Sequence, residues 1–197
     1  MKGREALPQT RPEPLDVDRI AVDAARRDPR RFETLYRKYV AQVYSFALYE
    51  TRDHHAAEDV TEQAFLGALR GLPDFTERAP DEGSTFRAWL FRICRNTIAN
   101  ERRYKRRHPV AALDLAADIA APDDPEGTAV TRDEVARAWR AVDALSDERR
   151  QALVLRFVNE MSAREIGAVM GRTEGAVRVL IHRALRAVAD DLSGRRL

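Results

Sequence analysis

The chain has 197 residues and a formal net charge of +2, with 44% hydrophobic and 34% charged residues. This length suits one or two small domains with packed cores and broad solvated faces. No apolar run is long enough to cross a membrane and we see no signal peptide, so we expect a cytoplasmic protein. Cys94 is the only cysteine, which excludes an internal disulfide and a cysteine-based zinc site.

Charge is distributed unevenly along the chain. Segments 53–83 and 110–134 each carry a local charge of −6, whereas segments 84–108 and 149–197 carry +7 and +5. Two basic blocks, each next to an acidic one, indicate two surfaces that face nucleic acid and two that face elsewhere.

Composition and helical periodicity divide the chain into four parts. Residues 1–15 contain three prolines and are predicted to be a disordered tail. Residues 16–107 are predicted to form a first domain and residues 131–197 a second. Residues 108–130 are rich in Ala, Pro and Asp and form an acidic, flexible linker between them. No stretch alternates at period two, so we predict an all-α fold.

Capping signals place the helices of the first domain. A short helix is expected from Asp16, and Asp28 followed by Pro29 opens a longer one. The residues predicted on its inner side are Phe32, Leu35, Tyr36, Tyr39, Val43 and Phe46. Asp53 is expected to cap a second long helix and Ser84 a third.

The third long helix carries a stripe that suits single-stranded DNA. Trp89, Arg92, Asn96 and Arg103 fall near one line, because separations of 3, 7 and 14 residues are close to whole turns. Aromatic rings stack on unpaired bases, amides hydrogen-bond base edges, and guanidinium groups hold phosphates. Core packing is the alternative for Trp89, and the sequence leaves both open.

The second domain ends in a predicted helix-turn-helix. Thr131 begins a capping box at the start of this domain, and Ser162 and Glu165 form another. Gly171 stands where a left-handed helix end is expected, and Thr173 is the next N-cap. Two short helices joined by such a turn present the second helix to the major groove.

The outward face of that last helix suits DNA. Its polar residues off the apolar stripe are Arg178, His182, Arg183 and Arg186. Arginine can donate two hydrogen bonds to guanine and can also hold phosphates. A surface helix with solvated arginines is the alternative, which the rest of the sequence disfavours.

The chain resembles a two-domain bacterial sigma factor of the extracytoplasmic-function (ECF) group, in the sigma-70 family. The stretch AAEDVTEQAFLGAL is similar to the helix by which that family docks on RNA polymerase. STFRAWLFRICRNTIANERRYKRR is similar to its promoter-melting part, and AVDALSDERRQALVLRFVNEMSAREIGAVMGRTEGAVRVLIHRALRAV to its domain four. The resemblance covers residues 28–107 and 131–192 and implies a sigma factor that directs promoter-specific transcription initiation.

The resemblance also implies roles for particular residues. Those implied to dock on the coiled coil of the polymerase β′ subunit are Glu58, Asp59, Glu62, Gln63 and Phe65. Those implied to engage the minus-10 element, with the loop before them, are Trp89, Arg92, Asn96 and Arg103. Those implied to contact the minus-35 element are Arg178, Val179, His182, Arg183 and Arg186. Domain four would also bind the β-subunit flap, no cofactor or metal is implied, and an anti-sigma factor stays open as a further partner.

Three features depart from the family pattern. The loop before Ser84 is long and carries Asp74, Glu77, Asp81 and Glu82, which leaves its base preference open. Leu180 stands where the family usually has a basic residue. Glu160 replaces a frequent glycine, so we expect Asn159 to take the left-handed position there.

Two other classes of protein were weighed against a sigma factor. A conventional activator or repressor needs an effector pocket or receiver domain in its N-terminal half, where this chain has an acidic helix beside a basic aromatic one. In an enzyme, His54, His55 and Glu58 could be imagined as a metal cluster. The sequence does not offer three well-placed ligands there, however, and it has no Gly-rich phosphate loop. Binding to core RNA polymerase separates the three classes.

Overall fold

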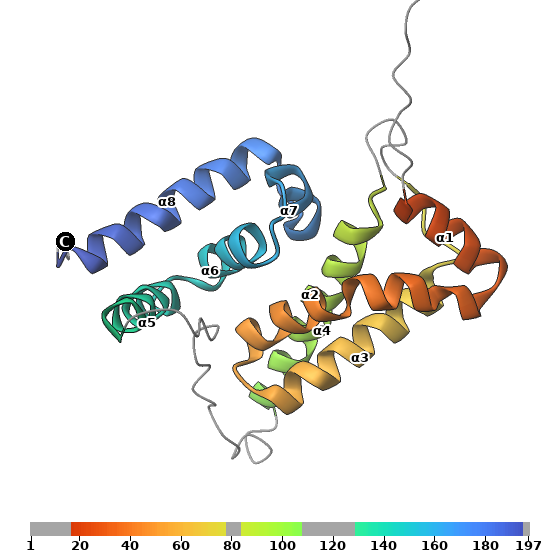
Figure 1. Cartoon of the computed structure of the whole chain (residues 1–197), viewed down its shortest axis with the longest axis horizontal. Helices are drawn as coiled ribbons and strands as arrows, with labels where there is room; N and C mark the ends of the chain where they lie inside the picture. Colours follow the sequence, from red (N-terminus) through yellow and green to blue (C-terminus); the bar gives the residue numbers. More distant parts are fainter. Residues whose placement is uncertain (1–16, 78–83, 108–128, 195–197) are drawn as a thin grey trace, which may run out of the picture.

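The computed structural model describes residues 17–77, 84–107 and 129–194, and every regular element within these ranges is a helix (Figure 1). The elements are α1 (Val17–Arg27), the 3-10 helix η1 (Pro29–Phe32), α2 (Glu33–Thr51), α3 (His54–Gly71), α4 (Phe86–Arg107), α5 (Ala129–Asp143), α6 (Asp147–Leu153), the π-helix η4 (Val154–Val158), α7 (Ala163–Met170) and α8 (Glu174–Leu192). The all-α prediction is confirmed for these residues. The predicted tail and all but the last two residues of the predicted linker lie outside them.

The first domain is built on α2 and α3, which lie side by side, with α4 crossing both (Figure 1). The facing side of α3 is lined by small residues, so its neighbours approach closely. A Cβ on Gly67 would lie 3.2 Å from the side chain of Ile93, and one on Gly71 would lie 3.2 Å from the Trp89 ring. Buried residues of α2, α3 and α4 include Leu35, Val43, Phe46, Ala57, Val60, Ala64, Ala68, Phe86, Leu90, Phe91, Cys94 and Ile98. Close helix contact therefore fixes α3 and α4 as one rigid unit.

Most of the predicted inner side of α2 is buried, but the prediction was wrong for Tyr36. Its side chain is 44% exposed, whereas Leu35 and Tyr39 are buried. Successive helix residues point about 100° apart, so Leu35 and Tyr36 cannot share one inward direction. Burial raises the pKa of the Tyr39 hydroxyl, which also donates a hydrogen bond to Asp18 of α1.

Local capping signals start the helices close to where the sequence placed them. The carboxylate of Asp28 accepts a hydrogen bond from the Arg30 amide (3.0 Å), although the first turn is the 3-10 helix η1 and α2 follows it. Asp53 likewise accepts from the Ala56 amide (3.0 Å). Helix α5 begins at Ala129, two residues before the expected capping position.

The predicted helix-turn-helix is formed by α7 and α8. The Ser162 hydroxyl accepts a hydrogen bond from the Glu165 amide (3.2 Å), and the Glu165 carboxylate accepts one from the Ser162 amide (2.8 Å). Gly171 adopts the left-handed conformation (φ 69°), and Thr173 caps α8 by accepting from the Ala176 amide (3.2 Å). The capping box and both turn signals are confirmed.

The expectation for the bend before α7 was wrong. Glu160 itself takes the left-handed conformation (φ 53°), and Asn159 does not (φ −98°). Asn159 is buried, and its side-chain amide donates a hydrogen bond to the carbonyl oxygen of Gln42 in the first domain (2.9 Å). That distant contact holds Asn159 in place and leaves the strained position to its neighbour.

Two further observations concern the single cysteine and the possibility of a membrane-spanning helix. Cys94 is fully buried, and burial raises the pKa of its thiol, so the side chain behaves as a small core residue. Among the described residues, no helix combines the length and apolar character that crossing a bilayer requires.

The turn between α7 and α8 generates a prediction about Gly167. A Cβ there would lie 2.6 Å from the carbonyl oxygen of Arg172, which belongs to the backbone of the turn. We expect Gly167→Ala to lower the free energy of unfolding by about 1–3 kcal/mol, because the turn must move to relieve the overlap. Gly175→Ala is the matched control, since a Cβ there meets nothing within 4 Å. Urea unfolding followed by circular dichroism measures both, and equal midpoints would contradict the packing described.

Candidate functional site

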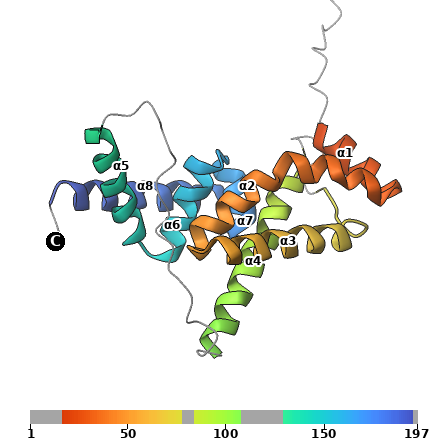
Figure 2. The ribbon, with the colours of Figure 1, turned by 60° about the horizontal axis from the view of Figure 1, so that its bottom comes forward.

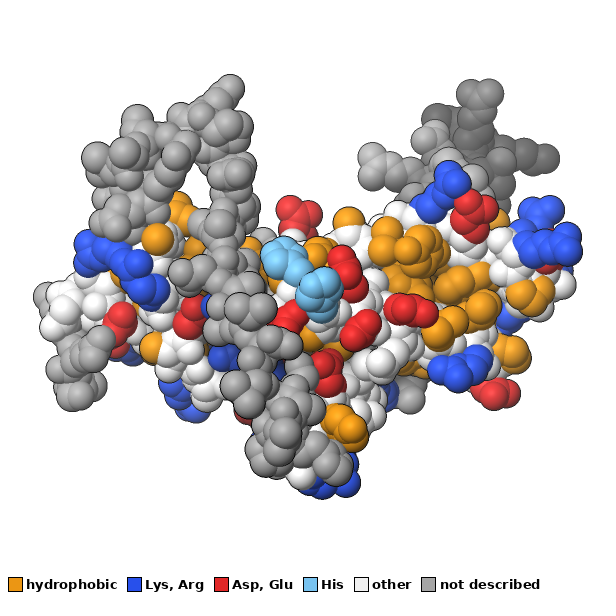
Figure 3. Space-filling view, turned by 90° about the horizontal axis from the view of Figure 1, so that it is seen from below, with side chains coloured by type: hydrophobic (Ala, Val, Ile, Leu, Met, Phe, Trp, Pro, Cys, Tyr) orange, Lys and Arg blue, Asp and Glu red, His pale blue; other side chains and the backbone are white. Residues whose placement is uncertain are grey.

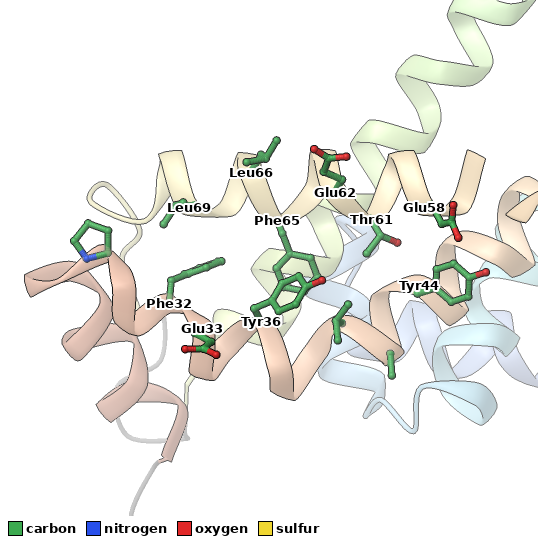
Figure 4. Close-up of a pocket in the computed structure, with 13 residues that line it drawn as sticks. Phe32, Glu33, Tyr36, Tyr44, Glu58, Thr61, Glu62, Phe65, Leu66 and Leu69 are labelled. Atoms are coloured by element: carbon green, nitrogen blue, oxygen red, sulfur yellow. The ribbon is translucent and has the colours of Figure 1, made fainter. Parts of the chain in front are cut away.

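A groove of about 710 Å³ runs along the surface between α2 and α3 (Figure 4). Its floor is aromatic: the Phe65 ring meets the Tyr36 ring edge-on at 4.9 Å and the Phe32 ring at 6.3 Å between centroids. Its rim carries carboxylates, from Glu33, Glu58 and Glu62. On this side of the molecule, acidic side chains lie beside an exposed hydrophobic patch (Figure 3). An apolar floor with an acidic rim suits a partner helix that combines apolar and basic side chains.

Three of the five predicted docking residues line the groove, and two lie beside it. Glu58, Glu62 and Phe65 line the groove, with both glutamates exposed and Phe65 only 5% exposed. Asp59 and Gln63 are exposed on α3 beside the groove but do not line it.

Sequence reasoning missed most of the apolar lining of the groove, of which Tyr36 and Leu66 are examples. Tyr36 and Leu66 both line it, and Leu66 is 46% exposed. The available signal was that Leu66 follows Phe65 directly, so the two side chains cannot both point inward.

The residues at the start of α3 that the sequence suggested as metal ligands make other contacts. His54 Nδ1 is hydrogen-bonded to the Tyr44 hydroxyl at 2.8 Å, and His55 Nδ1 lies 3.8 Å from the Glu58 carboxylate. Within the described ranges, no group of three or more His, Cys, Asp or Glu side chains is arranged to hold a metal ion.

The stripe on α4 is partly buried at one end and exposed at the other. The Trp89 ring packs against Phe75 (4.8 Å between centroids) and Phe86 (5.7 Å), while Asn96 and Arg103 are exposed. Trp89 therefore contributes to the core while keeping part of its surface outside it. The C-terminal end of α4 projects beyond the other helices (Figure 2), so its basic side chains can reach a nucleic acid backbone.

Trp89 and Arg92 also line a smaller hollow of about 360 Å³. The opposite wall of this hollow is formed by Arg164 and Ala168 of α7. Half of the stripe thus faces the second domain of the same chain.

Glu77, which the sequence assigned to the loop before α4, holds the start of that helix. Its carboxylate accepts hydrogen bonds from the Ser84 hydroxyl (2.5 Å), the Thr85 amide (2.6 Å) and the Thr85 hydroxyl (2.8 Å). The Ser84 hydroxyl in turn accepts from the Phe86 amide (3.2 Å), as its predicted capping role requires. A carboxylate at this position satisfies exposed amides and favours the positive end of the helix dipole.

All five residues predicted to read the minus-35 element are exposed on α8: Arg178, Val179, His182, Arg183 and Arg186. Arg178 donates a hydrogen bond to Glu174 one turn earlier, which holds its side chain along the helix. Leu180 is partly buried and packs against the core. Its apolar character, which departs from the family pattern, is explained by this packing.

Comparison with known proteins agrees with this geometry. Residues 35–108 match the family description Sigma-70 region 2, and residues 136–188 match Sigma-70, region 4. The RNA polymerase sigma-H factor of Pseudomonas aeruginosa is 34% identical over 184 residues, covering 88% of this chain and 92% of that protein. The chain therefore belongs to the sigma-70 family of RNA polymerase sigma factors, in its ECF group.

Other relatives differ more in length. The ECF RNA polymerase sigma factor BldN of Streptomyces coelicolor is 33% identical over 159 residues, which are 80% of this chain and 59% of that protein. The chain likewise spans 63% of the length of SigD of Mycobacterium tuberculosis. Among solved structures, CnrH in complex with the cytosolic domain of CnrY is similar with a TM-score of 0.66 and 26% identity, covering 92% of this chain and 100% of that one.

The hydrogen bonds that the Glu77 carboxylate accepts at the start of α4 yield a prediction. Replacing Glu77 with alanine removes three hydrogen bonds to a charged acceptor, so we expect Glu77→Ala to lower the free energy of unfolding by about 1–3 kcal/mol. Glu77→Gln keeps a hydrogen-bond acceptor, so its free energy of unfolding should lie between those of the wild type and Glu77→Ala. Asp74→Ala is the control, because it removes the same charge from an exposed position three residues earlier. Identical urea midpoints for Glu77→Ala and Asp74→Ala would show that the hydrogen bonds of Glu77 do not stabilise the start of α4.

Proposed function

We propose that this chain is a sigma factor that binds core RNA polymerase and directs promoter-specific transcription initiation. The observation that carries the proposal is the pairing of an acidic, apolar-floored groove with arginine-bearing faces on two other helices of a sigma-70 fold. Such a protein acts in the cytoplasm as a DNA-binding regulator. No catalytic, metal or cofactor role is proposed for any of its residues.

We assign polymerase docking to the groove and the exposed side of α3. Glu58 and Glu62 would meet basic side chains of the β′ coiled coil at the rim, with Asp59 and Gln63 alongside. The aromatic floor around Phe65 would receive apolar side chains of the same coiled coil. Charged rims chiefly direct association, whereas buried aromatic contacts hold the complex together.

We assign promoter recognition to α4 and α8. On α4, Trp89, Arg92, Asn96 and Arg103 would engage the minus-10 element as it melts, because the exposed amide can reach base edges and the ring can stack. On α8, the arginines, His182 and Val179 would contact the minus-35 element in the major groove. Domain four would also bind the β flap.

A regulatory protein of the anti-sigma class is a further partner that we propose. The solved relative CnrH is bound to the cytosolic domain of a second protein, CnrY. The similarity to CnrH extends over both domains of this chain, which gives such a partner the same pair of domains to bind.

The docking assignment is tested by reversing charge on α3. Asp59→Lys combined with Glu62→Lys should weaken binding to core RNA polymerase at least tenfold, which is about 1.4 kcal/mol. The effect should come mainly from Glu62, because it lines the groove and Asp59 does not. Asp23→Lys with Asp190→Lys changes the net charge equally on exposed sites away from the groove. Equal affinities of the two double variants for core polymerase would remove the groove from the docking surface.

The melting assignment is tested at Asn96, which is exposed and therefore tolerant of substitution. Asn96→Ala should keep its affinity for core polymerase and lower open-complex formation, since a lost base-edge contact costs roughly 1–3 kcal/mol. Permanganate reactivity of promoter thymines in the reconstituted holoenzyme measures melting, after circular dichroism has shown a native fold. Wild-type reactivity in a folded, polymerase-bound variant would show that the stripe does not hold melted DNA.

A further inference from the structure

One residue outside the predicted sites, Arg26 of α1, connects that helix to the turn that follows α3. Its Nε donates a hydrogen bond to the carbonyl oxygen of Leu72 (3.1 Å), 46 residues further along the chain. Its guanidinium carbon lies 5.7 Å from the centroid of the Phe75 ring. In both ribbon views α1 lies beside this turn (Figures 1 and 2). Arg26 therefore holds the turn through a hydrogen bond and a cation–π contact at the same time.

The position of Arg26 is itself fixed. The start of α1 is anchored by Asp18, whose carboxylate accepts hydrogen bonds from the Tyr39 hydroxyl and from Lys38 (2.6 Å), both of α2. The buried face of the helix consists of Ala21, Val22 and Ala25. The Arg26 side chain is 32% exposed, and its guanidinium lies 3.8 Å from the Asp23 carboxylate. A side chain on a helix anchored in this way can fix the turn that it contacts.

The turn after α3 is tight and partly buried. The Asp74 amide donates a hydrogen bond to the carbonyl oxygen of Gly71, and the Phe75 amide donates one to that of Leu72, each at 3.2 Å. Leu72 is 2% exposed and Phe75 is 5% exposed. Leu72 stands at the C-terminal end of α3, where carbonyl groups lack helical partners and the helix dipole is negative. A guanidinium group at this end is therefore favourable both as a donor and as a cation.

Phe75 carries this placement to α4. Its ring lies 4.8 Å from the Trp89 ring and meets the Phe86 ring edge-on at 5.9 Å, both measured between centroids. The same turn confines Trp89 on a second side, since a Cβ on Gly71 would lie 3.2 Å from the Trp89 ring. Packing this close leaves no free space between the turn and the ring, so a displaced turn displaces Trp89 as well.

The turn also forms a wall of the smaller hollow beside the α4 stripe. Asp74, Phe75 and Thr76 line the hollow from the turn, and Trp89 and Arg92 line it from α4. Asp74 and Thr76 are exposed, and their side-chain oxygens can accept hydrogen bonds from the amino groups of bases. The residue that holds the turn from α1 does not line the hollow. It can affect what binds there only by placing the groups that do.

The other end of this short segment is held by Glu77, whose carboxylate accepts hydrogen bonds from Ser84 and Thr85 at the start of α4. Residues 72–77 are thus attached to α1 at one end and to α4 at the other. Substitution of Arg26 would release the first attachment and leave the second intact. The turn would then gain freedom while the start of α4 stayed in place.

We propose that Arg26 is a positioning residue for minus-10 recognition, which holds the turn after α3 so that its polar side chains and Trp89 meet promoter bases in one arrangement. This inference rests on the proposed assignment of minus-10 recognition to α4. Arg26 acts through Phe75 rather than by touching DNA. Without it the turn takes several positions, so preferred and disfavoured bases are bound more equally. Arg26 does not line the groove between α2 and α3, so docking on core polymerase is unaffected.

The test compares Arg26→Ala with Arg27→Ala in the full-length chain. Arg27 is the matched control, because it carries the same charge at the next position of α1 and is exposed. Both substitutions are made in a Trp139→Phe background, which leaves Trp89 as the only tryptophan. Acrylamide quenching of fluorescence then reports how firmly the Trp89 ring is held. Permanganate reactivity in the reconstituted holoenzyme measures melting of a promoter selected with the unsubstituted chain and of single-base variants of its minus-10 element.

We expect Arg26→Ala to increase quenching of Trp89 and to lower discrimination between the selected promoter and its variants at least about threefold, which is less than a mismatched base pair usually costs. Affinity for core polymerase should not change. Arg26→Lys keeps the charge but lacks the planar guanidinium group, so it should restore discrimination only in part. Phe75→Leu removes the ring between Arg26 and Trp89 and should reproduce the loss. If circular dichroism shows that Arg26→Ala does not fold, Arg26→Lys against Arg27→Lys supplies the same comparison.

Equal discrimination in Arg26→Ala and Arg27→Ala would overturn the inference. So would a lower stability of Arg26→Ala with unchanged discrimination, because that result describes a contact that only supports the fold. Failure of the unsubstituted chain to bind core polymerase or to melt any promoter would instead overturn the proposed function, and it would be recognised because it appears without any change at Arg26.

Discussion

One fully buried carboxylate, that of Glu50 in α2, helps to set the relative placement of the two domains. A carboxylate so far from water is stable only where hydrogen-bond donors reach it. Here they come from α4 on one side and α6 on the other. The apolar core is continuous across the same region, so the polar contacts fix the angle at which two already compatible surfaces meet. Apolar contact favours association of the two domains, and the hydrogen bonds of the carboxylate make one relative orientation more stable than the others.

A second constraint separates the acidic and basic surfaces of the first domain. The groove lies between α2 and α3, with Glu58 and Glu62 on α3, and the arginine-bearing stripe lies on α4, which also packs against α3. Glycine and alanine on α3 allow that contact to be close. A displacement of α3 would therefore be transmitted to α4, because neither helix can shift without opening the core between them.

Much of the fold could be predicted from the sequence because its signals are local. Ser162 with Glu165, Gly171 and Thr173 mark helix ends through neighbours within a few residues, and the structure has all of them as expected. The left-handed Glu160 and the capping by Glu77 depend on a distant partner or on loop closure, which local patterns do not record. The outward direction of Tyr36 differs from these, because it follows from helix geometry next to the buried Leu35 and was open to prediction. The contacts between the two domains were unforeseen for the same reason as Glu160 and Glu77: Glu50 lies in an apolar helical pattern, and its partners are more than 50 residues away. The roles of the docking and DNA-facing residues remain predictions, although their exposure on α3, α4 and α8 is compatible with them.

The exposed face of α8 shares no residue with the contacts between the two domains. Arg178, His182 and Arg186 point to solvent, while the contacts that hold the domains together come from α5, α6, α7 and the bend before α7. Mutations in the exposed residues of α8 can therefore accumulate without disturbing the contacts between the domains, and the reverse is also true. In evolutionary terms, the residues that would set target preference and the residues that hold the domains together can change independently within one short chain.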